Sequence, residues 1–249
     1  MDEIVFSELC QETLQSLEVR TSCELEEDTR GQYLSERWRS ERSKRISSTY
    51  FKDVADRRIT TSCSNLVKKI IYKCSVQTLA IKYGIVNERI AARKYEEETG
   101  RKIKNCGLFI DVANPFLCTS PDGLIGDDGL IEIKCPYSAR NVSTLIEISQ
   151  NHNIGLKYNP NGEAFLPTKH KYFYQIQGQL AITGRSWCDL YFWCPKDTVV
   201  IRIRKDEAFW EKILPKLKSF YMDCILPEVV DPREKRNLEI RDLYIKKAT

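Results

Sequence analysis

The sequence predicts an α/β fold in which a central mixed β-sheet is flanked by helices, with a helical region at the N-terminus. Strand-like runs occur within residues 103–134 and again at 187–194 and 198–204. Stretches with the helical period cover residues 77–99 and 169–183, next to these strands along the chain. Helices that alternate with strands in this way are typical of an α/β domain, in which the helices cover the sheet.

Residues 119–136, TSPDGLIGDDGLIEIKCP, are expected to form two short strands joined by a turn. The turn is indicated by Gly126–Gly129, which lies between two apolar runs. Folding the two strands back on each other brings Asp122 near Glu132. Because side chains alternate along a strand, Glu132 and Lys134 share one face. The stretch therefore predicts two carboxylates and one ammonium close together.

This charge cluster predicts a metal-dependent site for phosphodiester hydrolysis. Two carboxylates close together repel each other, and a hard divalent cation such as Mg²⁺ removes the repulsion. The main-chain carbonyl of Ile133 supplies a further oxygen, and Lys134 faces the attacking water or the scissile phosphate. An isolated Glu-x-Lys is also typical of an ordinary exposed strand. In this chain the preceding Ser-Pro-Asp-Gly and the closing Cys-Pro make the combination far more specific.

The composition limits the class of protein. The chain has 249 residues, 30% charged and 42% hydrophobic, and a net charge of +4, which permits a nucleic-acid partner without requiring one. Its ten cysteines include no Cys-x-x-Cys pair, and His152 and His170 are the only histidines, so a zinc site or histidine-based catalysis is poorly supported. Without a signal sequence or a membrane-length apolar run, we expect an intracellular, reducing compartment, the nucleus in a eukaryotic host, and no secretion.

A basic segment lies in the N-terminal part of the chain. We expect an amphipathic helix at 3–18, a polar linker at 19–34, and a helix at 34–45 with arginines on one face. The hydroxyl-rich residues 46–49 follow this helix, and arginines beside hydroxyl groups are suited to bind phosphate. The same pattern is also typical of a solvated basic helix with an ordinary cap. The arginine face consists of Trp38, Arg42 and Arg45.

One acidic side chain is expected on an apolar helix face. In the helix at 77–99, Glu88 shares a stripe with Ile81, Ile85, Ala92 and Tyr95. A buried glutamate is rare unless it is paired or binds a metal, so Glu88 becomes a candidate ligand. The alternative is an ordinary salt bridge at the edge of the stripe, to Arg89 or Arg93.

The residues alone assign no definite role to the remaining segments. A short helix is predicted at 64–75, a long irregular stretch at 137–168 and a closing helix at 206–223. In the helix at 169–183, Gln175 and Gln179 are neighbours on one face, although glutamine is also simply a good helix former. Arg202 and Arg204 alternate with isoleucines in the last strand, which predicts an edge strand with one basic face.

The motifs Ser120–Gly123 (SPDG) and Glu132–Pro136 (EIKCP) closely resemble those of the PD-(D/E)xK nuclease superfamily. Within it, the chain is similar to the phage lambda exonuclease and YqaJ-like viral recombinase group, over roughly Trp38 to Tyr221. The resemblance implies a restriction-endonuclease-like core. It also implies an N-terminal helical extension at residues 1–34, an exonuclease domain at 35–228 and a charged tail at 229–249.

The resemblance also assigns roles to individual residues. Asp122, Glu132 and the Ile133 carbonyl would bind Mg²⁺, with Mn²⁺ as a substitute, and Lys134 would orient the attacking water. Glu88, in a Gly-x-x-x-Glu context, would support the metal directly or through water. Gln175, in the Gln-Ile-Gln run, would lie beside the catalytic lysine. A DNA 5′-phosphate would be held by Arg42, Thr49, Ser47 and Ser120, with Thr49 where the family usually has serine.

The activity implied is 5′→3′ digestion of linear double-stranded DNA during recombination. The resemblance adds a homotrimer and a single-strand annealing protein as partners, and no membrane. Three alternatives stay open: a structure-selective endonuclease on the same core, a non-catalytic DNA-binding scaffold for recombination, and an RNA-directed nuclease.

Overall fold

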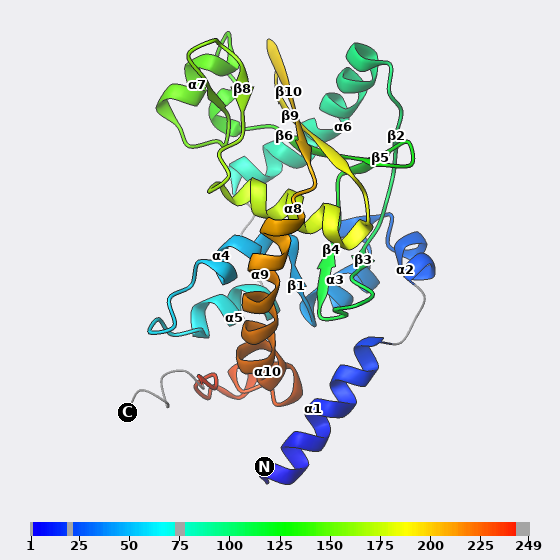
Figure 1. Cartoon of the computed structure of the whole chain (residues 1–249), viewed down its shortest axis with the longest axis vertical. Helices are drawn as coiled ribbons and strands as arrows, with labels where there is room; N and C mark the ends of the chain where they lie inside the picture. The colour runs from blue at the N-terminus through cyan, green and yellow to red at the C-terminus, as the bar shows by residue number, and fades with distance from the viewer. Residues whose placement is uncertain (1, 19–21, 73–77, 243–249) are drawn as a thin grey trace. The chain divides into compact units, whose positions relative to one another are not determined.

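The computed structural model describes residues 2–18, 22–72 and 78–242 (Figure 1). The chain forms two compact units. Unit 1 comprises residues 1–74, 107–120 and 207–249, and unit 2 comprises residues 75–106 and 121–206. These boundaries differ from the three consecutive regions that the resemblance implies, and those regions stay a prediction.

Unit 2 is built on a five-stranded mixed sheet, as predicted. Its strand order is β10-β9-β6-β5-β2, and β6 and β9 are the parallel pair, whereas the other neighbours are antiparallel. β10 lies at one edge and exposes Arg202 and Arg204, which confirms the predicted basic edge strand. The strands are β2 (Ile103–Lys104), β5 (Gly123–Ile125), β6 (Gly129–Lys134), β9 (Trp187–Cys194) and β10 (Asp197–Arg204).

Two helices cover the two faces of this sheet. Ala91 and Tyr95 of α6 (Leu79–Thr99) pack against Ile131 and Ile133 of β6. α8 (Lys171–Thr183) contacts the side chain of Glu132, which points to the opposite face because side chains alternate along the strand. The predicted sheet flanked by helices is therefore confirmed (Figure 1).

The hairpin of β5 and β6 forms in the predicted place. Gly123 pairs with Ile131, and the strands are joined by a turn at residues 126–128. β6 begins at Gly129, which lies under the indole of Trp187. A β-carbon on Gly129 would lie 2.2 Å from the Trp187 ring, so close packing excludes any larger residue here.

The stretch at 137–168 is more regular than the sequence predicts. It contains the short 3₁₀ turn η3 (Tyr137–Ala139), the helix α7 (Leu145–Asn151) and the hairpin of β7 (Lys157–Tyr158) and β8 (Ala164–Phe165). α7 begins with a capping box formed by Thr144 and Glu147, a signature that the sequence carries openly. The expectation of an irregular loop is wrong.

Unit 1 contains a second, three-stranded sheet with the order β1-β4-β3. β1 (Ile46–Ser47) and β4 (Leu117–Thr119) are parallel, and β3 (Phe109–Ile110) is antiparallel to β4. The sequence predicted that all strands before residue 134 belong to one sheet, and this is wrong for β3 and β4. The chain enters unit 1 at Gly107, where Leu108 and Cys118 bury their side chains against Leu25.

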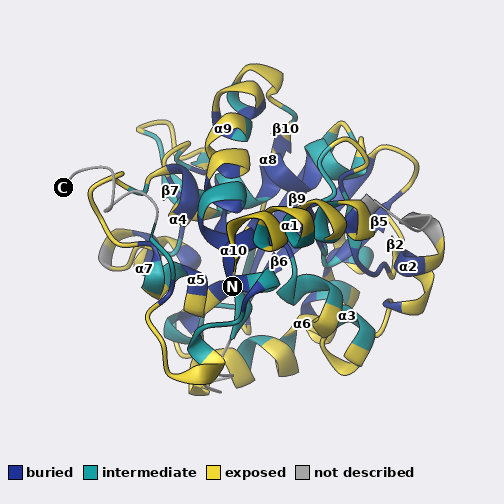
Figure 2. Ribbon diagram, turned by 90° about the horizontal axis from the view of Figure 1, so that it is seen from below, coloured by how far each residue is buried: buried dark blue, intermediate teal, exposed yellow. Residues whose placement is uncertain are grey.

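Helices make up most of unit 1. The helix predicted at 3–18 is present with these bounds, and those predicted at 34–45, 64–75 and 206–223 are present with shifted ends; residues 73–75 lie outside the described residues. The linker predicted at 19–34 is wrong in part, because residues 22–28 are helical; residues 19–21 lie outside the described residues. Figure 2 shows the many exposed residues of α1. The helical elements are α1 (Glu3–Glu18), α2 (Ser22–Asp28), η1 (Gln32–Leu34), α3 (Glu36–Ser43), η2 (Ser48–Tyr50), α4 (Phe51–Ala55), α5 (Ser64–Ile71), α9 (Glu207–Phe220), the π-helical η4 (Tyr221–Ile225), α10 (Leu226–Val230) and η5 (Glu234–Arg236).

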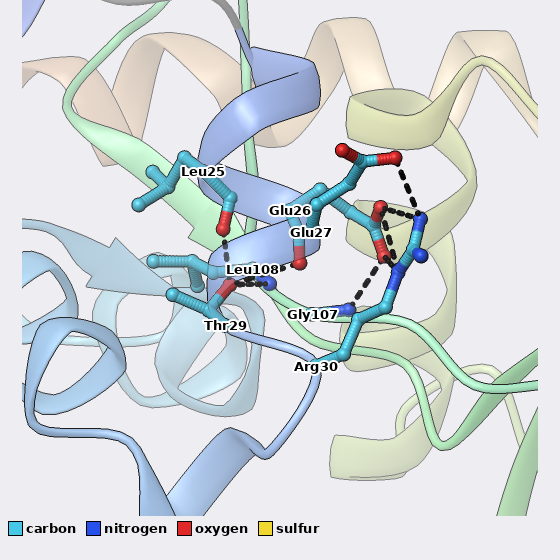
Figure 3. A network of polar contacts seen from close by, with 7 residues as sticks. All are labelled: Leu25, Glu26, Glu27, Thr29, Arg30, Gly107 and Leu108. Atoms are coloured by element: carbon cyan, nitrogen blue, oxygen red, sulfur yellow. Dashed lines mark hydrogen bonds and ion pairs between the residues drawn. The ribbon is translucent and has the colours of Figure 1, made fainter.

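A polar network joins α2 to the start of the 107–120 segment (Figure 3). The main-chain N–H of Gly107 donates to Glu26 Oε1 at 2.8 Å, and that of Leu108 donates to Thr29 Oγ1 at 2.8 Å. Arg30 pairs with the same glutamate at 2.7 Å. A β-carbon on Gly107 would lie 2.0 Å from the carbonyl oxygen of Glu26, so the contact requires glycine. The network replaces the missing strand partners of residues 107–108 with side-chain acceptors.

The C-terminal segment packs onto unit 1. Ile240 is 6% exposed, and the carboxylate of Asp242 accepts a hydrogen bond from the N–H of Cys63 at 2.8 Å. The carboxylate of Asp231 pairs with Arg236 and with Arg241. Among the helices described, none combines the length and the apolar character needed to cross a membrane.

Candidate active site

The hairpin places Asp122 beside β6, the strand that carries the candidate site residues Glu132 and Lys134. Asp122 precedes β5 by one residue, and the strand register places it opposite Glu132. Its Oδ2 accepts a hydrogen bond of 2.6 Å from the N–H of Ile133. This bond fixes one carboxylate oxygen against the strand.

Glu132 is the centre of the site. Its side chain lies on the α8 face of the sheet and the residue is 2% exposed. Oε1 contacts the ammonium of Lys134 and accepts a hydrogen bond of 2.7 Å from Gln175 Nε2. Oε2 accepts a hydrogen bond of 2.6 Å from Gln179 Nε2. The ammonium of Lys134 also lies 4.7 Å from the centre of the Tyr172 ring.

The charges of these groups act on each other. Burial raises the pKa of Asp122 well above its usual range, and the charges of Glu132 and Glu88 raise it further. Burial opposes the charged form of Lys134, but the carboxylates of Glu132 and Asp122 outweigh it and raise the pKa of Lys134, which stays an ammonium. The cluster therefore carries more negative charge than one lysine neutralises.

Glu88 lies beside this cluster but is not buried. The side chain is exposed, and so are Ile81 (48%) and Ile85 (39%) on the same helix. The predicted buried apolar stripe is wrong for the first half of α6, because there only the half-buried Tyr83 packs against the core, and the fully buried positions are Ala91 and Tyr95. Partial desolvation and then the charge of Glu132 raise the pKa of Glu88, which places it within electrostatic reach of the site.

The residues present fit a hard divalent cation. Across residues 2–18, 22–72 and 78–242, no cluster of three or more histidine, cysteine, aspartate and glutamate side chains is placed to hold a metal, so Glu88 does not complete a three-acid site. Mg²⁺ does not need one, since it is commonly bound by one or two carboxylates and several waters. Asp122 and Glu132 offer carboxylate oxygens, and a divalent ion would favour the charged form of Asp122, whose pKa is raised first by burial and then by the charges of Glu132 and Glu88.

In unit 1, several hydroxyl groups gather where the parallel strands β1 and β4 end. Ser48 is the residue after β1, and Thr119 is the last residue of β4. Their hydroxyl groups share a hydrogen bond of 2.7 Å. Ser47 is buried, and its Oγ has no hydrogen-bond partner among the described residues. Thr49 is exposed. Three of these hydroxyls, on Ser47, Ser48 and Thr49, come from the segment that the sequence singled out.

Trp38 contacts both Arg42 and Ser120, the residue that follows β4. The guanidinium of Arg42 stacks over the Trp38 ring at 4.3 Å, and the indole N–H donates to Ser120 Oγ at 2.8 Å. Arg45, which the sequence placed on the same face, is buried instead. It donates to the carbonyl of Pro115 at 2.7 Å and pairs with Glu41, so its role is structural.

A sequence model of the YqaJ-like viral recombinase domain matches residues 37–186 of the chain. The chain belongs to this family. The match includes every candidate site residue described above, from Arg42 to Gln179.

Solved structures agree with this family. The chain is similar to an alkaline exonuclease (LHK-Exo) from Laribacter hongkongensis, with 26% identity, a TM-score of 0.61, and coverage of 82% of this chain and 98% of that one. The same exonuclease in complex with dAMP gives a TM-score of 0.62. The Shutoff and Exonuclease Protein from Kaposi's sarcoma-associated herpesvirus, at 12% identity, has a TM-score of 0.53 and covers 91% of this chain and 75% of that one, which shows a shared fold. No curated protein sequence matches the chain.

Two residues at the site were not singled out by sequence reasoning. Gln179 was noted only as a neighbour of Gln175, and Tyr172 was given no role. The signal for Gln179 was available: residues four apart on a helix lie side by side, so both amides reach one partner. For Tyr172 no such signal existed, because a tyrosine at the start of a helix is equally compatible with packing in the hydrophobic core.

Proposed function

We propose that this chain is a Mg²⁺-dependent deoxyribonuclease that digests linear double-stranded DNA from the 5′ end during recombination. The observation that carries the proposal is the convergence of Asp122, Glu132 and Lys134 on one hairpin in a chain of this family. The fold and the 26% identity shared with an alkaline exonuclease support an end-dependent activity.

In this proposal Asp122, Glu132 and the Ile133 carbonyl hold the ion, with Mn²⁺ as a substitute. When bound, the ion supplies a Lewis acid that polarises the phosphoryl group. Lys134 stays protonated beside Glu132 and stabilises the negative charge that develops on the phosphate oxygens. Gln175 holds the Glu132 oxygen that Lys134 also contacts, and Glu88 adds negative charge at the edge of the site.

We propose that the terminal 5′-phosphate binds to the cluster of hydroxyl-bearing residues in unit 1. Arg42, oriented by the Trp38 ring, supplies the charge, and Ser120, Thr49 and Ser47 supply hydroxyl donors. The unpartnered Oγ of Ser47 supports this assignment, since a buried hydroxyl usually has a partner.

The catalytic assignment is tested by Glu132→Ala and Lys134→Ala. Each variant is expected to lose at least ~10²-fold in the rate of nucleotide release from linear duplex DNA with Mg²⁺, because each removes a charged group from the reacting centre. The exposed residues Glu97 and Lys104 supply matched controls, Glu97→Ala and Lys104→Ala, that keep wild-type rates. Wild-type rates in either site variant would contradict the catalytic assignment. Nucleotide release that persists in EDTA would contradict the proposed metal dependence.

The end dependence is tested with two substrates. A linear duplex with a 5′-phosphate should be degraded faster than the same duplex with a 5′-hydroxyl, and a covalently closed plasmid should stay intact. Cutting of the closed plasmid would favour the endonuclease alternative, and no hydrolysis of either form would favour the non-catalytic scaffold.

The same two linear substrates test the arginine. Arg42→Ala should remove the preference for the phosphorylated end, whereas Arg39→Ala, on the exposed part of the same helix α3, should preserve it. If the wild type degrades the 5′-phosphate and the 5′-hydroxyl duplex equally fast, the proposal that unit 1 binds the 5′-phosphate is contradicted. The homotrimer and the single-strand annealing partner rest on the resemblance alone and stay predictions.

A further inference from the structure

We propose that Gln179 is a positioning residue that fixes the carboxylate of Glu132 for the divalent ion; this rests on the proposed function. Gln179 is fully buried, and its Nε2 donates to Glu132 Oε2 at 2.6 Å. Gln175, one helical turn earlier, donates to the other oxygen at 2.7 Å. The two amides of α8 therefore hold both oxygens of one carboxylate.

The orientation of the Gln179 amide is determined by its partner. An ionised carboxylate only accepts hydrogen bonds, so the NH₂ group of Gln179 must face Glu132. This leaves Gln179 Oε1 buried without a hydrogen-bond partner among the described residues. A buried acceptor without a partner costs free energy, and an apolar side chain of the same size would avoid that cost. The contact to Glu132 is the interaction that offsets it.

The two oxygens of Glu132 are held differently. Oε1 is shared between Lys134 and Gln175, whereas Oε2 accepts its hydrogen bond from Gln179. Gln179 thus holds Oε2 and, together with the donors to Oε1, opposes rotation of the carboxylate about its last bond. Groups that orient a metal ligand in this way typically change metal affinity or activity by 10–100-fold when they are removed.

The test is Gln179→Met, which has nearly the same size and lacks both the amide donor and the unpartnered acceptor. The half-saturating Mg²⁺ concentration should rise about 10-fold and kcat should fall about 10-fold, while KM for linear duplex DNA stays within about twofold. The first quantity is also measured without DNA, as the Mg²⁺ concentration that gives half of the rise in Tm.

Gln177 provides the matched control. It is buried on the same helix, but its amide bonds to the main chain, donating to the Arg204 carbonyl at 2.9 Å and accepting from the Asp206 N–H at 2.8 Å. Gln177→Met should lower Tm and leave the Mg²⁺ midpoint at the wild-type value. Gln179→Met should instead raise the Mg²⁺ midpoint, because it leaves Glu132 Oε2 without its hydrogen-bond donor.

The outcomes separate this inference from the proposed function. A wild-type Mg²⁺ midpoint in a folded Gln179→Met variant overturns the inference, even if the wild type is an active nuclease. A chain that shows the expected midpoint change but hydrolyses no DNA keeps the inference and loses the proposed function. If Mg²⁺ does not raise the wild-type Tm, the inference falls with the metal site. Should Gln179→Met fail to fold, Gln179→Leu is measured under the same criteria.

Discussion

The carboxylate of Glu132 is buried under three hydrogen-bond donors, and Asp122 faces the same cluster without such support. Oδ2 of Asp122 accepts one hydrogen bond, from the Ile133 N–H, while burial and the charges of Glu132 and Glu88 raise its pKa well above the usual range. A carboxylate in this position destabilises the fold when it is ionised.

Asp122→Asn should therefore stabilise the metal-free protein at neutral pH. The amide keeps an oxygen that can accept from the Ile133 N–H, and it removes one of the repelling charges. Because the pKa of Asp122 is raised in the folded state, its destabilising effect is fully present above that pKa and disappears as the pH falls through it. The gain in the variant should follow the same course.

Thermal unfolding with EDTA at several pH values measures this prediction. An increase in Tm of roughly 2–4 °C corresponds to about 1 kcal/mol for a chain of this size. Added Mg²⁺ should raise Tm in the wild type more than in the variant, and nuclease activity should be lost. An unchanged or lower Tm in EDTA would mean that Asp122 is not held under repulsion.

At the scale of elements, the site depends on how closely β6 packs against β9. Gly129 begins β6, and Trp187 begins β9 directly opposite in the parallel register. The Trp187 ring covers Gly129 on one side and is stacked at 3.8 Å by the guanidinium of Arg202, which pairs with the buried Asp189. The ring is therefore held in place and cannot easily make room for a side chain.

Gly129→Ala is expected to destabilise the protein by about 1–3 kcal/mol, because the new methyl group would lie 2.2 Å from the indole. Gly84→Ala is the matched control: it lies within α6 with open space around it, and should stabilise by roughly 0.5–1 kcal/mol. Denaturant unfolding measures both. Adding Trp187→Leu to Gly129→Ala should recover part of the loss, and equal destabilisation by the two glycine variants would refute the packing argument.

The hairpin is the element that the sequence predicted best, and the reason is physical. Alternation of Leu130, Glu132 and Lys134 with Ile131 and Ile133 specifies which face each side chain takes, and the glycine-rich turn specifies the register. Both features depend only on neighbouring residues, so the hairpin can be predicted without knowing how the rest of the chain folds.

Contacts that depend on tertiary packing were not predictable in the same way. Which face of α8 turns toward β6 decides the role of Gln179, and no pattern in α8 alone fixes that rotation. The strands β3 and β4 are two and three residues long, too short to indicate the sheet they join. The helix α2 is mostly polar and acidic, and its packing is provided by Leu25 and by side-chain bonds to residues 107–108.

At the scale of the whole molecule, the alternation of the two units along the chain was invisible to pattern analysis. The candidate metal ligands fall in unit 2 and the candidate phosphate-binding residues fall in unit 1, although the sequence motifs follow one another without any linker. The C-terminal segment, predicted from the sequence only as a charged tail, is packed onto unit 1 as far as Asp242.

Asp231→Asn should lower the stability of unit 1. Although burial opposes its charge, the hydrogen bonds and charges of Arg241 and Arg236 lower the pKa of Asp231. A lowered pKa means that the stabilisation is present above the ordinary aspartate range and is lost as the pH falls through the folded-state value. We expect a loss of about 1.5–3 kcal/mol at pH 7, which shrinks as the pH falls below about 4.

Urea unfolding at both pH values measures this loss, with Asp127→Asn, in the exposed turn before β6, as the control that should change little. A variant that is as stable as the wild type at pH 7 would show that the C-terminal segment contributes no stability to unit 1.

Unit 2 is complete in the chain at Asp206, whereas unit 1 still needs the segment that starts at Glu207. Domains fold as units while the chain is being synthesised, as soon as their residues have left the ribosome. The hairpin that carries Asp122 and Glu132 can therefore pack against α8 before α9 has been synthesised. At that stage β1 and β4 of unit 1 still lack the C-terminal segment of their unit. A nascent chain whose residues 1–206 have all left the ribosome should thus contain the formed acidic cluster, whereas unit 1, which holds the candidate phosphate-binding residues, should not yet be folded.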